Sequence, residues 1–157
     1  MSAVYLTRDG FHKLSDELER LKQVERPKIS KAIGEARLQG DLSENAEYDA
    51  AKEAQAHCEA RIVELGNALS QASIIEDQNI PSDKVYIGAF VTLKDLISQE
   101  EIKYQVVAPE ESDYDANKVS IYSPVGKGLM QHAQDDEVEI ETPAGIMKYK
   151  ILQIERP

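Results

Sequence analysis

Four acidic residues within nine positions are the first feature of this sequence that could support chemistry. They are Asp41, Glu44, Glu47 and Asp49. Carboxylates crowded in this way repel one another unless a cation lies beside them. Mg²⁺ sites commonly use one or two protein carboxylates, and water and substrate phosphates complete the coordination. Asp41 and Glu44 are therefore candidate ligands of a divalent metal in a site that another molecule would complete.

The same two residues also have a purely structural explanation. An acid at the N-cap of a helix and a glutamate three residues later form a capping box, in which each side chain serves a free backbone donor. Acids near a helix N-terminus are favoured by the helix dipole as well. In this interpretation Asp41 is the N-cap of a helix and Glu44 is its partner. Spacing alone leaves both interpretations open.

The acids lie in a break between two segments in which apolar residues recur every three or four positions. Such a pattern predicts two helices that pack along one seam. We therefore expect an antiparallel coiled-coil hairpin over residues 1–76, with its tip near residues 40–48. The predicted seam of the first arm is Phe11, Leu14, Leu18, Leu21, Val24, Lys28 or Ile29, Ala32 and Ala36, and that of the second is Ala51, Ala54, Cys58, Ile62, Leu65, Leu69 and Ala72.

Three residues mark the course of the first arm. Thr7 is the expected N-cap. Pro27 lies inside the apolar pattern, and because proline removes a backbone donor we expect a kink near residues 24–26 rather than a stop. Gly40 is placed to end the helix in a left-handed conformation.

The helical pattern ends at a linker, residues 77–83, that contains turn-forming residues. Residues 84–157 alternate as strands do, which predicts a small antiparallel sheet and an α+β fold for the whole chain. Ser123 followed by Pro124 resembles an N-cap and a first helical residue, and predicts one short helix through about His132. The expected strands are Val85–Leu93, Glu101–Val107, Lys118–Tyr122, Glu137–Glu141 and Met147–Ile154.

Composition excludes several classes of function. The formal net charge of −11 argues against electrostatically driven binding to free nucleic acid. No apolar run is long enough to span a membrane, and a cytoplasmic location is expected. The histidines and Cys58 have no zinc-site spacing, and no Ser/His/Asp set is visible. The acidic run at residues 110–115 is expected to be an exposed turn.

The break between the arms carries a motif of high specificity. Residues 35–53 read EARLQGDLSENAEYDAAKE, which closely resembles the signature of the bacterial GreA-type transcript cleavage factors. The resemblance covers essentially the whole chain. Further segments similar to family segments follow in the same order: Leu6–Thr7, Glu25–Pro27, Val119–Pro124 and Glu141–Gly145. Residues 110–115 and 123–133 depart from the pattern, which bears on docking rather than on the tip.

The resemblance implies a coiled-coil finger and a C-terminal domain of the FKBP-like kind. In this family the globular domain docks on RNA polymerase at the rim of its secondary channel, and the region around Ser123 and Pro124 is the expected docking surface here. The finger then enters the channel and stimulates the polymerase's own cleavage of the nascent RNA 3′ end in a backtracked complex. The protein would be no enzyme by itself, and a monomer when free.

Carried over by position, the resemblance gives roles to the residues of the tip. Asp41 and Glu44 would help hold the second, weakly bound Mg²⁺ jointly with the polymerase, and would orient the attacking water. Support of the tip is expected from Ser43, Asn45, Glu47 and Tyr48. Arg37 and Lys52 are basic residues that could face RNA, and their small number favours the GreA type over the GreB type.

Three other functions are weighed against this one. The first is a channel-binding regulator that does not promote cleavage, which the presence of Asp41 and Glu44 argues against. The second is a coiled-coil adaptor whose acidic tip is only a helix cap. The third, a stand-alone Mg²⁺ nuclease, lacks both the ligands and a basic groove.

Overall fold

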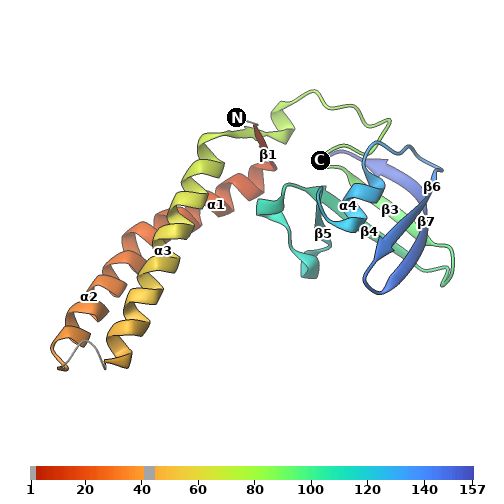
Figure 1. Ribbon diagram of the computed structural model, residues 1–157. Coiled ribbons are helices and arrows are strands. Elements are labelled where there is room, and N and C mark those ends of the chain that lie inside the picture. Colours follow the sequence, from red (N-terminus) through yellow and green to blue (C-terminus); the bar gives the residue numbers. More distant parts are fainter. Residues whose placement is uncertain (1–2, 41–44) are drawn as a thin grey trace. The chain divides into compact units, whose positions relative to one another are not determined.

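The protein, seen here as a computed structural model, is described over residues 3–40 and 45–157. It divides into a helical unit, Phe11–Gln71, and a sheet unit formed by Met1–Gly10 and Ala72–Pro157 (Figure 1). These bounds differ from the predicted ones, which gave residues 1–76 to the hairpin and 77–83 to a linker. The difference arises because β1 (Val4–Leu6) pairs in parallel with β2 (Ala72–Ile74), and both strands belong to the sheet unit.

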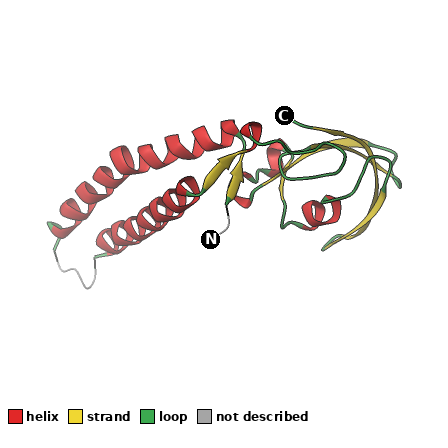
Figure 2. Ribbon diagram, turned by 90° about the horizontal axis from the view of Figure 1, so that it is seen from above, coloured by secondary structure: helices red, strands yellow, loops and turns green. Residues whose placement is uncertain are grey.

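The helical unit is the predicted hairpin. Its first arm runs through α1 (Arg8–Arg20), which begins in the sheet unit, then a π-helical turn (Leu21–Glu25) and α2 (Arg26–Arg37). The second arm is α3 (Ala46–Ser70), which at 25 residues is about 37 Å long. The two arms lie side by side (Figure 2). Among the described residues, no helix has both the length and the apolar character needed to cross a bilayer.

The π-helical turn takes the place of the kink expected near Pro27. The Arg26 N–H donates to the carbonyl of Leu21, five residues back. Pro27 follows directly and has no N–H to donate. The widened turn therefore places the proline in the first turn of α2, where a missing donor costs least.

One extra residue in this turn shifts the seam of the first arm. Val24, a predicted seam residue, is 52% exposed, and Ala32 is exposed as well. Ile33 is buried in their place, because a π-turn rotates the following residues around the helix axis. In α3, Ala54 of the predicted seam is exposed, whereas Ala68, which was not predicted to lie in the seam, is buried. Ala72 was predicted as the last seam residue but lies in β2.

Two forked ion pairs join the arms. Arg61 of α3 donates to both carboxylate oxygens of Glu17 at 2.8 and 3.0 Å. Arg26 donates to both oxygens of Glu59 at 2.8 Å. The hydrogen bond to Glu17 raises the pKa of Arg61 further above its ordinary value. Such bidentate pairs restrict geometry as well as adding attraction, so they hold the arms in one register.

The sheet unit contains a five-stranded sheet in the order β5-β4-β3-β7-β6. Most neighbours are antiparallel, as predicted, but β4 and β5 are parallel. Parallel neighbours need a crossover connection, and residues 108–117 provide one with two 3₁₀ turns. The strands are β3 (Phe90–Asp95), β4 (Glu101–Val107), β5 (Lys118–Ser120), β6 (Glu137–Thr142) and β7 (Gly145–Glu155).

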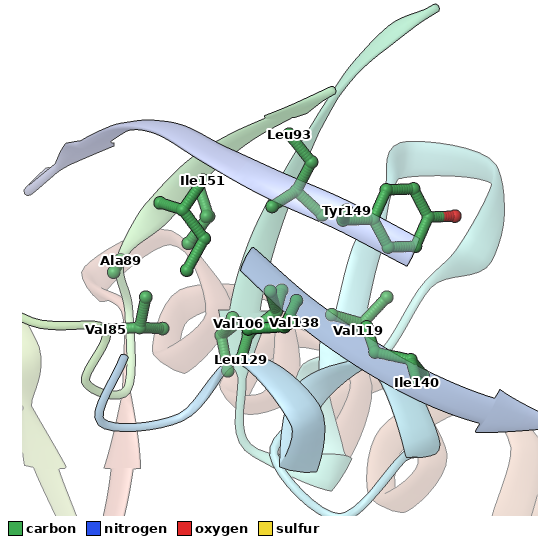
Figure 3. Packing of buried hydrophobic residues seen from close by; sticks show 11 residues of the cluster. Val85, Ala89, Leu93, Val106, Val119, Leu129, Val138, Ile140, Tyr149 and Ile151 are labelled. Carbon is green, nitrogen blue, oxygen red and sulfur yellow. The ribbon is translucent and has the colours of Figure 1, made fainter. Parts of the chain in front are cut away.

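The core of the sheet unit lies between the curled sheet and α4 (Pro124–Leu129) (Figure 3). Leu93, Val106 and Ile151 contribute fully buried side chains from three neighbouring strands. The first predicted strand, Val85–Leu93, was too early. Its opening residues form a turn instead, in which the Ala89 N–H donates to the carbonyl of Tyr86 at 3.1 Å.

Thr7 is the N-cap of α1, as predicted, and a residue far away in sequence completes the cap. The Gly10 N–H donates to the Thr7 hydroxyl oxygen at 3.0 Å. The Thr7 N–H donates to Glu111 Oε2 at 2.8 Å, and the Thr7 hydroxyl donates to Glu111 Oε1. In a capping box the glutamate stands three residues after the cap. Here that position is Gly10, and Glu111 serves from 104 residues away.

Glu111 was expected in an exposed turn, but it is 9% exposed. A Cβ on residue 10 would lie 2.0 Å from Glu111 Oε1. The Glu111 carboxylate takes the place of a capping-box glutamate at position 10, and a glycine there leaves room for it. The only local sign of the distant partner is that position 10, where a capping box would have a glutamate, is a glycine.

Candidate functional site at the tip of the hairpin

The end of α2 forms one side of the tip. Leu38 is the C-cap, and the N–H groups of Leu38 and Gln39 donate to carbonyls of the last turn at 3.1 Å. Gly40 follows with φ +122°, a conformation that favours glycine. Helix α2 therefore ends close to where the sequence predicted. Leu38 is 88% exposed at this point, which is unusual for a large apolar side chain.

The start of α3 forms the other side, and Asn45 holds the two sides together. Its Oδ1 accepts a hydrogen bond from the Tyr48 N–H at 3.1 Å and caps the helix. Its Nδ2 donates to the carbonyl of Ala36 in α2 at 2.6 Å. One amide thus satisfies backbone groups at the end of one arm and the start of the other.

The N-cap of α3 is therefore Asn45, and not Asp41 as in the capping-box alternative. N-cap preference does not distinguish Asp41 from Asn45, because aspartate and asparagine are equally good N-cap residues. Asn45 is favoured by its amide N–H, since a carboxylate could not donate to the carbonyl of Ala36. The role expected of Asn45, support of the tip, fits this geometry.

Asp41, Ser43 and Glu44 lie outside the described residues. With Leu42 they connect Gly40 to Asn45 in sequence. The metal-binding and catalytic roles expected of Asp41 and Glu44, and the supporting role of Ser43, remain predictions.

The described acids of the tip lie in the first turn of α3. Glu47 and Asp49 are both exposed. Their negative charge interacts favourably with the positive end of the helix dipole. This arrangement accounts for Glu47 and Asp49 as helix-stabilising residues, and it gives neither of them a partner that would mark a metal site.

The basic residues expected near the tip have different surroundings. The Arg37 guanidinium lies 5.9 Å from the centre of the Tyr48 ring, so α2 and α3 also meet through a cation–π contact. Lys52 donates to Gln55 Oε1 at 2.9 Å, one turn further along α3. Both basic side chains are on the exposed surface, and their contact with RNA remains a prediction.

Small residues allow the arms to approach closely here. Ala36 of α2 is 3% exposed and Ala51 of α3 is 9% exposed. Larger buried residues, Ile62 and Leu65, follow toward the base of α3. Buried alanines therefore face the partner arm near the tip, and larger apolar side chains do so nearer the base.

Carboxylate oxygens are suitable ligands for Mg²⁺, and the tip provides them without completing a site. Within residues 3–40 and 45–157, no group of three or more His, Cys, Asp or Glu side chains could hold a metal ion. A metal shared between Asp41, Glu44 and another macromolecule therefore stays a prediction.

Ser123 and Pro124, the residues expected at a docking surface, open α4 in the sheet unit. Ser123 Oγ accepts a hydrogen bond from the Gly126 N–H at 3.0 Å and donates to the carbonyl of Ser120 at 2.6 Å. Pro124 is the first residue of the helix. The predicted cap is confirmed, although α4 ends at Leu129 and not near His132. Docking through these residues remains a prediction.

Comparison with known proteins defines the class to which this fold and tip belong. Residues 4–74 match the family described as "Transcription elongation factor, N-terminal". Residues 80–156 match the family described as "Transcription elongation factor, GreA/GreB, C-term". The two matches together span both units.

The chain belongs to the GreA/GreB family of transcription elongation factors. It is 47% identical over 152 residues to the transcription elongation factor GreA of Pelobacter propionicus, covering 97% of this chain and 96% of that relative. It is 49% identical to GreA of Chloroherpeton thalassium over 96% of this chain and 95% of that relative. A solved structure, GreA factor homolog 1 of Thermus thermophilus, is 32% identical over 98% of this chain and 99% of its own, with a TM-score of 0.45.

Proposed function

We propose that this protein acts on bacterial RNA polymerase as a transcript cleavage factor. The hairpin enters the secondary channel of the enzyme, and its tip reaches the active site when the nascent RNA has backtracked. The protein stimulates the polymerase's own hydrolysis of the extruded RNA 3′ end and so rescues the arrested complex. It acts in the cytoplasm, as a monomer when free.

The observation that carries this proposal is the cap of α3. Asn45 caps the helix and bonds to Ala36 on the opposite arm. The N-cap position of α3 is thus taken by Asn45 and not by Asp41, which weakens the capping-box interpretation. Two acids three positions apart, in the segment that joins the two arms of the hairpin, support a role in a site shared with another molecule.

Asp41 and Glu44 are proposed to hold a Mg²⁺ ion jointly with the polymerase. A metal held in this way supplies an activated water and stabilises the charge that develops on the phosphate. The protein's own residues orient that water and set the tip in place. Because the two carboxylates act in the transition state, their loss should impair catalysis more than binding.

The remaining residues are proposed to position the tip. Asn45 fixes the distance between the arms, and Glu47 stabilises the first turn of α3. Tyr48 holds Arg37 across the tip. Arg37 and Lys52 are then available to attract the RNA backbone near the cleavage point.

The test is RNA cleavage in a stalled, backtracked elongation complex with its cognate polymerase and Mg²⁺. The variants are Asp41→Asn and Glu44→Gln, with Asp49→Asn as the matched control, because Asp49 is an exposed acid of the same tip. We expect short 3′ fragments with the wild type and with the control, and a loss of at least about a hundredfold in cleavage rate in the two variants.

Binding to the polymerase is measured in parallel. Retained binding with lost cleavage in the Asp41 and Glu44 variants would support the shared metal site. Binding without cleavage by the wild type would contradict the proposal and leave a regulator that occupies the channel. Equal loss in all three variants would point to tip charge in general rather than to these two carboxylates.

A further inference from the structure

The first arm of the hairpin packs only loosely on α3 around the π-helical turn. Leu14 and Ile33 are buried, but none of residues 15–32 between them is. Two hollows, of about 460 and 260 Å³, lie along this stretch, and Ile29 and Cys58 line both of them. Side chains that line a hollow lack contacts on one side. Apolar packing therefore leaves the rotation of α2 about its own axis weakly determined where the helix begins.

The rotation of α2 matters because the first arm has two alternative seams. In one continuous α-helix, Val24 and Ala32 would face α3, whereas Ile33 does so after the π-helical turn. A shift of one residue corresponds to a rotation of about 100° around the helix axis. Such a rotation would carry the carbonyl of Ala36 away from Asn45, to which it is bonded at the tip. The geometry of the tip therefore depends on which seam the arm keeps.

A forked ion pair lies at the start of α2, directly after the π-helical turn. Arg26 donates from Nε and Nη2 to the two carboxylate oxygens of Glu59 on α3, both at 2.8 Å. The backbone N–H of Arg26 donates to the carbonyl of Leu21 and closes the widened turn. The side-chain hydrogen bonds lower the pKa of Glu59 and raise the pKa of Arg26, so both groups are charged near neutral pH.

The surroundings of this pair suit a geometric role better than an energetic one. Both side chains are 45% exposed, and exposed ion pairs contribute little to stability. A bidentate pair of guanidinium and carboxylate nevertheless fixes the orientation of one group relative to the other. The pair of Arg26 and Glu59 therefore restrains the rotation of α2 at the place where apolar packing does not.

We propose that Arg26 and Glu59 are positioning residues for transcript cleavage, because they hold α2 in the rotation that places the tip. Neither residue touches the reacting atoms. Their effect passes along α2 to the carbonyl of Ala36 and from there to Asn45 at the start of α3. The proposal rests on the proposed function and adds two residues outside the tip on which the cleavage rate depends.

The test measures the rate of RNA cleavage in the backtracked elongation complex over a range of concentrations of the full-length protein. Glu59→Gln keeps the shape of the side chain and removes its charge. Glu17→Gln is the matched control, because Glu17 forms the same kind of fork with Arg61 but lies before the π-helical turn. We expect Glu59→Gln to lower the rate at saturating protein about tenfold, since misplaced reacting groups react slowly. Its half-saturating concentration should stay unchanged, and the control should match the wild type in both quantities.

An exchange of the two charges tests whether the pairing itself is responsible. Arg26→Glu alone sets two acids against each other and should slow cleavage at saturation at least as much as Glu59→Gln does. Arg26→Glu combined with Glu59→Arg restores an ion pair of opposite direction and should recover most of the lost rate. A double variant that is no faster than Arg26→Glu would overturn the proposal.

A measurement on the free protein follows the rotation of α2 without the polymerase. Spin labels replace Glu35 of α2 and Glu53 of α3, which are both exposed, in a Cys58→Ala background that removes the single native cysteine. Pulsed electron paramagnetic resonance then gives the distribution of distances between the arms. We expect Glu59→Gln to shift or broaden this distribution, and Glu17→Gln to leave it as in the labelled parent protein. Identical distributions for Glu59→Gln and the parent would refute a restraint on α2.

The outcomes separate this proposal from the proposed function and from simple instability. If the wild type cleaves and Glu59→Gln is equally fast at saturation, positioning by this pair is refuted while the proposed function stands. If the wild type itself does not stimulate cleavage, the proposed function fails, and the role of the pair in cleavage fails with it. Urea unfolding of Glu59→Gln should match that of Glu17→Gln. A lower midpoint that reduces the folded fraction in the cleavage assay would assign the slower rate to instability and overturn the proposal.

Discussion

Asn45 Nδ2 donates a hydrogen bond of 2.6 Å to the carbonyl of Ala36, and the same amide caps α3. The two helical arms are therefore joined at their tip by one side chain. Asn45 directly follows Glu44 in the sequence, one of the acids that are proposed to act in the polymerase. The precision with which those acids are placed should depend on it.

Asn45→Ala is expected to lose both hydrogen bonds. The free energy of unfolding of the helical unit should fall by about 1–2 kcal/mol, the usual cost of losing a cap. Amide hydrogen exchange at Tyr48 should become faster, because its N–H then has no acceptor. Asn45→Asp keeps the acceptor and loses the donor to Ala36, so Tyr48 should stay protected. Unchanged exchange in Asn45→Ala would show that the cap is unimportant.

Asp41→Asn and Glu44→Gln are expected to leave the stability of the free protein nearly unchanged. Because Asn45 is the N-cap of α3, the change in unfolding free energy should stay within about 0.5 kcal/mol. Urea denaturation of the full-length protein measures this, with Asn45→Ala as the destabilised reference. A loss as large as that of Asn45→Ala would restore the capping-box interpretation and with it the adaptor function.

Local patterns in the sequence predicted much of the fold. The hairpin follows from apolar periodicity, and the caps Thr7 and Ser123 follow from residue type next to a helical pattern. The prediction was wrong about which residues after the π-helical turn face the second arm. Pro27 showed that a donor is missing, but not that the chain would respond with a widened turn that exposes Val24 and buries Ile33.

Features that join distant parts of the chain could not be predicted. The partnership of Thr7 with Glu111 spans 104 residues, and no local pattern pairs the two. The parallel alignment of β4 and β5 depends on the path of residues 108–117. At the tip, the motif identified the region, but the choice of Asn45 as the cap depends on a carbonyl of the other arm.

Gly10→Ala is expected to destabilise the sheet unit through Glu111. The added Cβ would lie 2.0 Å from Glu111 Oε1, so the carboxylate must move and lose its hydrogen bonds to Thr7. We expect a cost of about 2–3 kcal/mol in unfolding free energy. Gly34→Ala is the control, because it lies in α2 with open space around it and should stabilise the protein by about 0.5–1 kcal/mol.

A double-mutant cycle separates this mechanism from an ordinary packing defect. In an Glu111→Ala background the obstructing carboxylate is gone, and Gly10→Ala should then be neutral or stabilising. Denaturant unfolding of the four proteins of the cycle gives the coupling energy. Equal costs of Gly10→Ala in both backgrounds would mean that Glu111 is not the reason for the glycine.

Tyr149 should make the sheet unit sensitive to alkaline pH. Its side chain packs into the core, and desolvation raises the pKa of its hydroxyl above the ordinary value, with Tyr104 and Asp95 adding to the effect. The unfolded chain loses this proton near pH 10, whereas the folded protein keeps it to a higher pH. The contribution to stability is therefore complete below about pH 10 and is lost as pH rises through the pKa of the folded state.

Denaturant unfolding followed by circular dichroism between roughly pH 9 and 11 measures this loss. Tyr149→Phe cannot ionise, so its stability should decline less steeply than that of the wild type across this range. Tyr114→Phe is the control, because Tyr114 is 71% exposed and its replacement should leave the wild-type slope intact. Parallel curves for the wild type and Tyr149→Phe would show that the buried hydroxyl does not titrate with unfolding, and that other groups cause any alkaline loss.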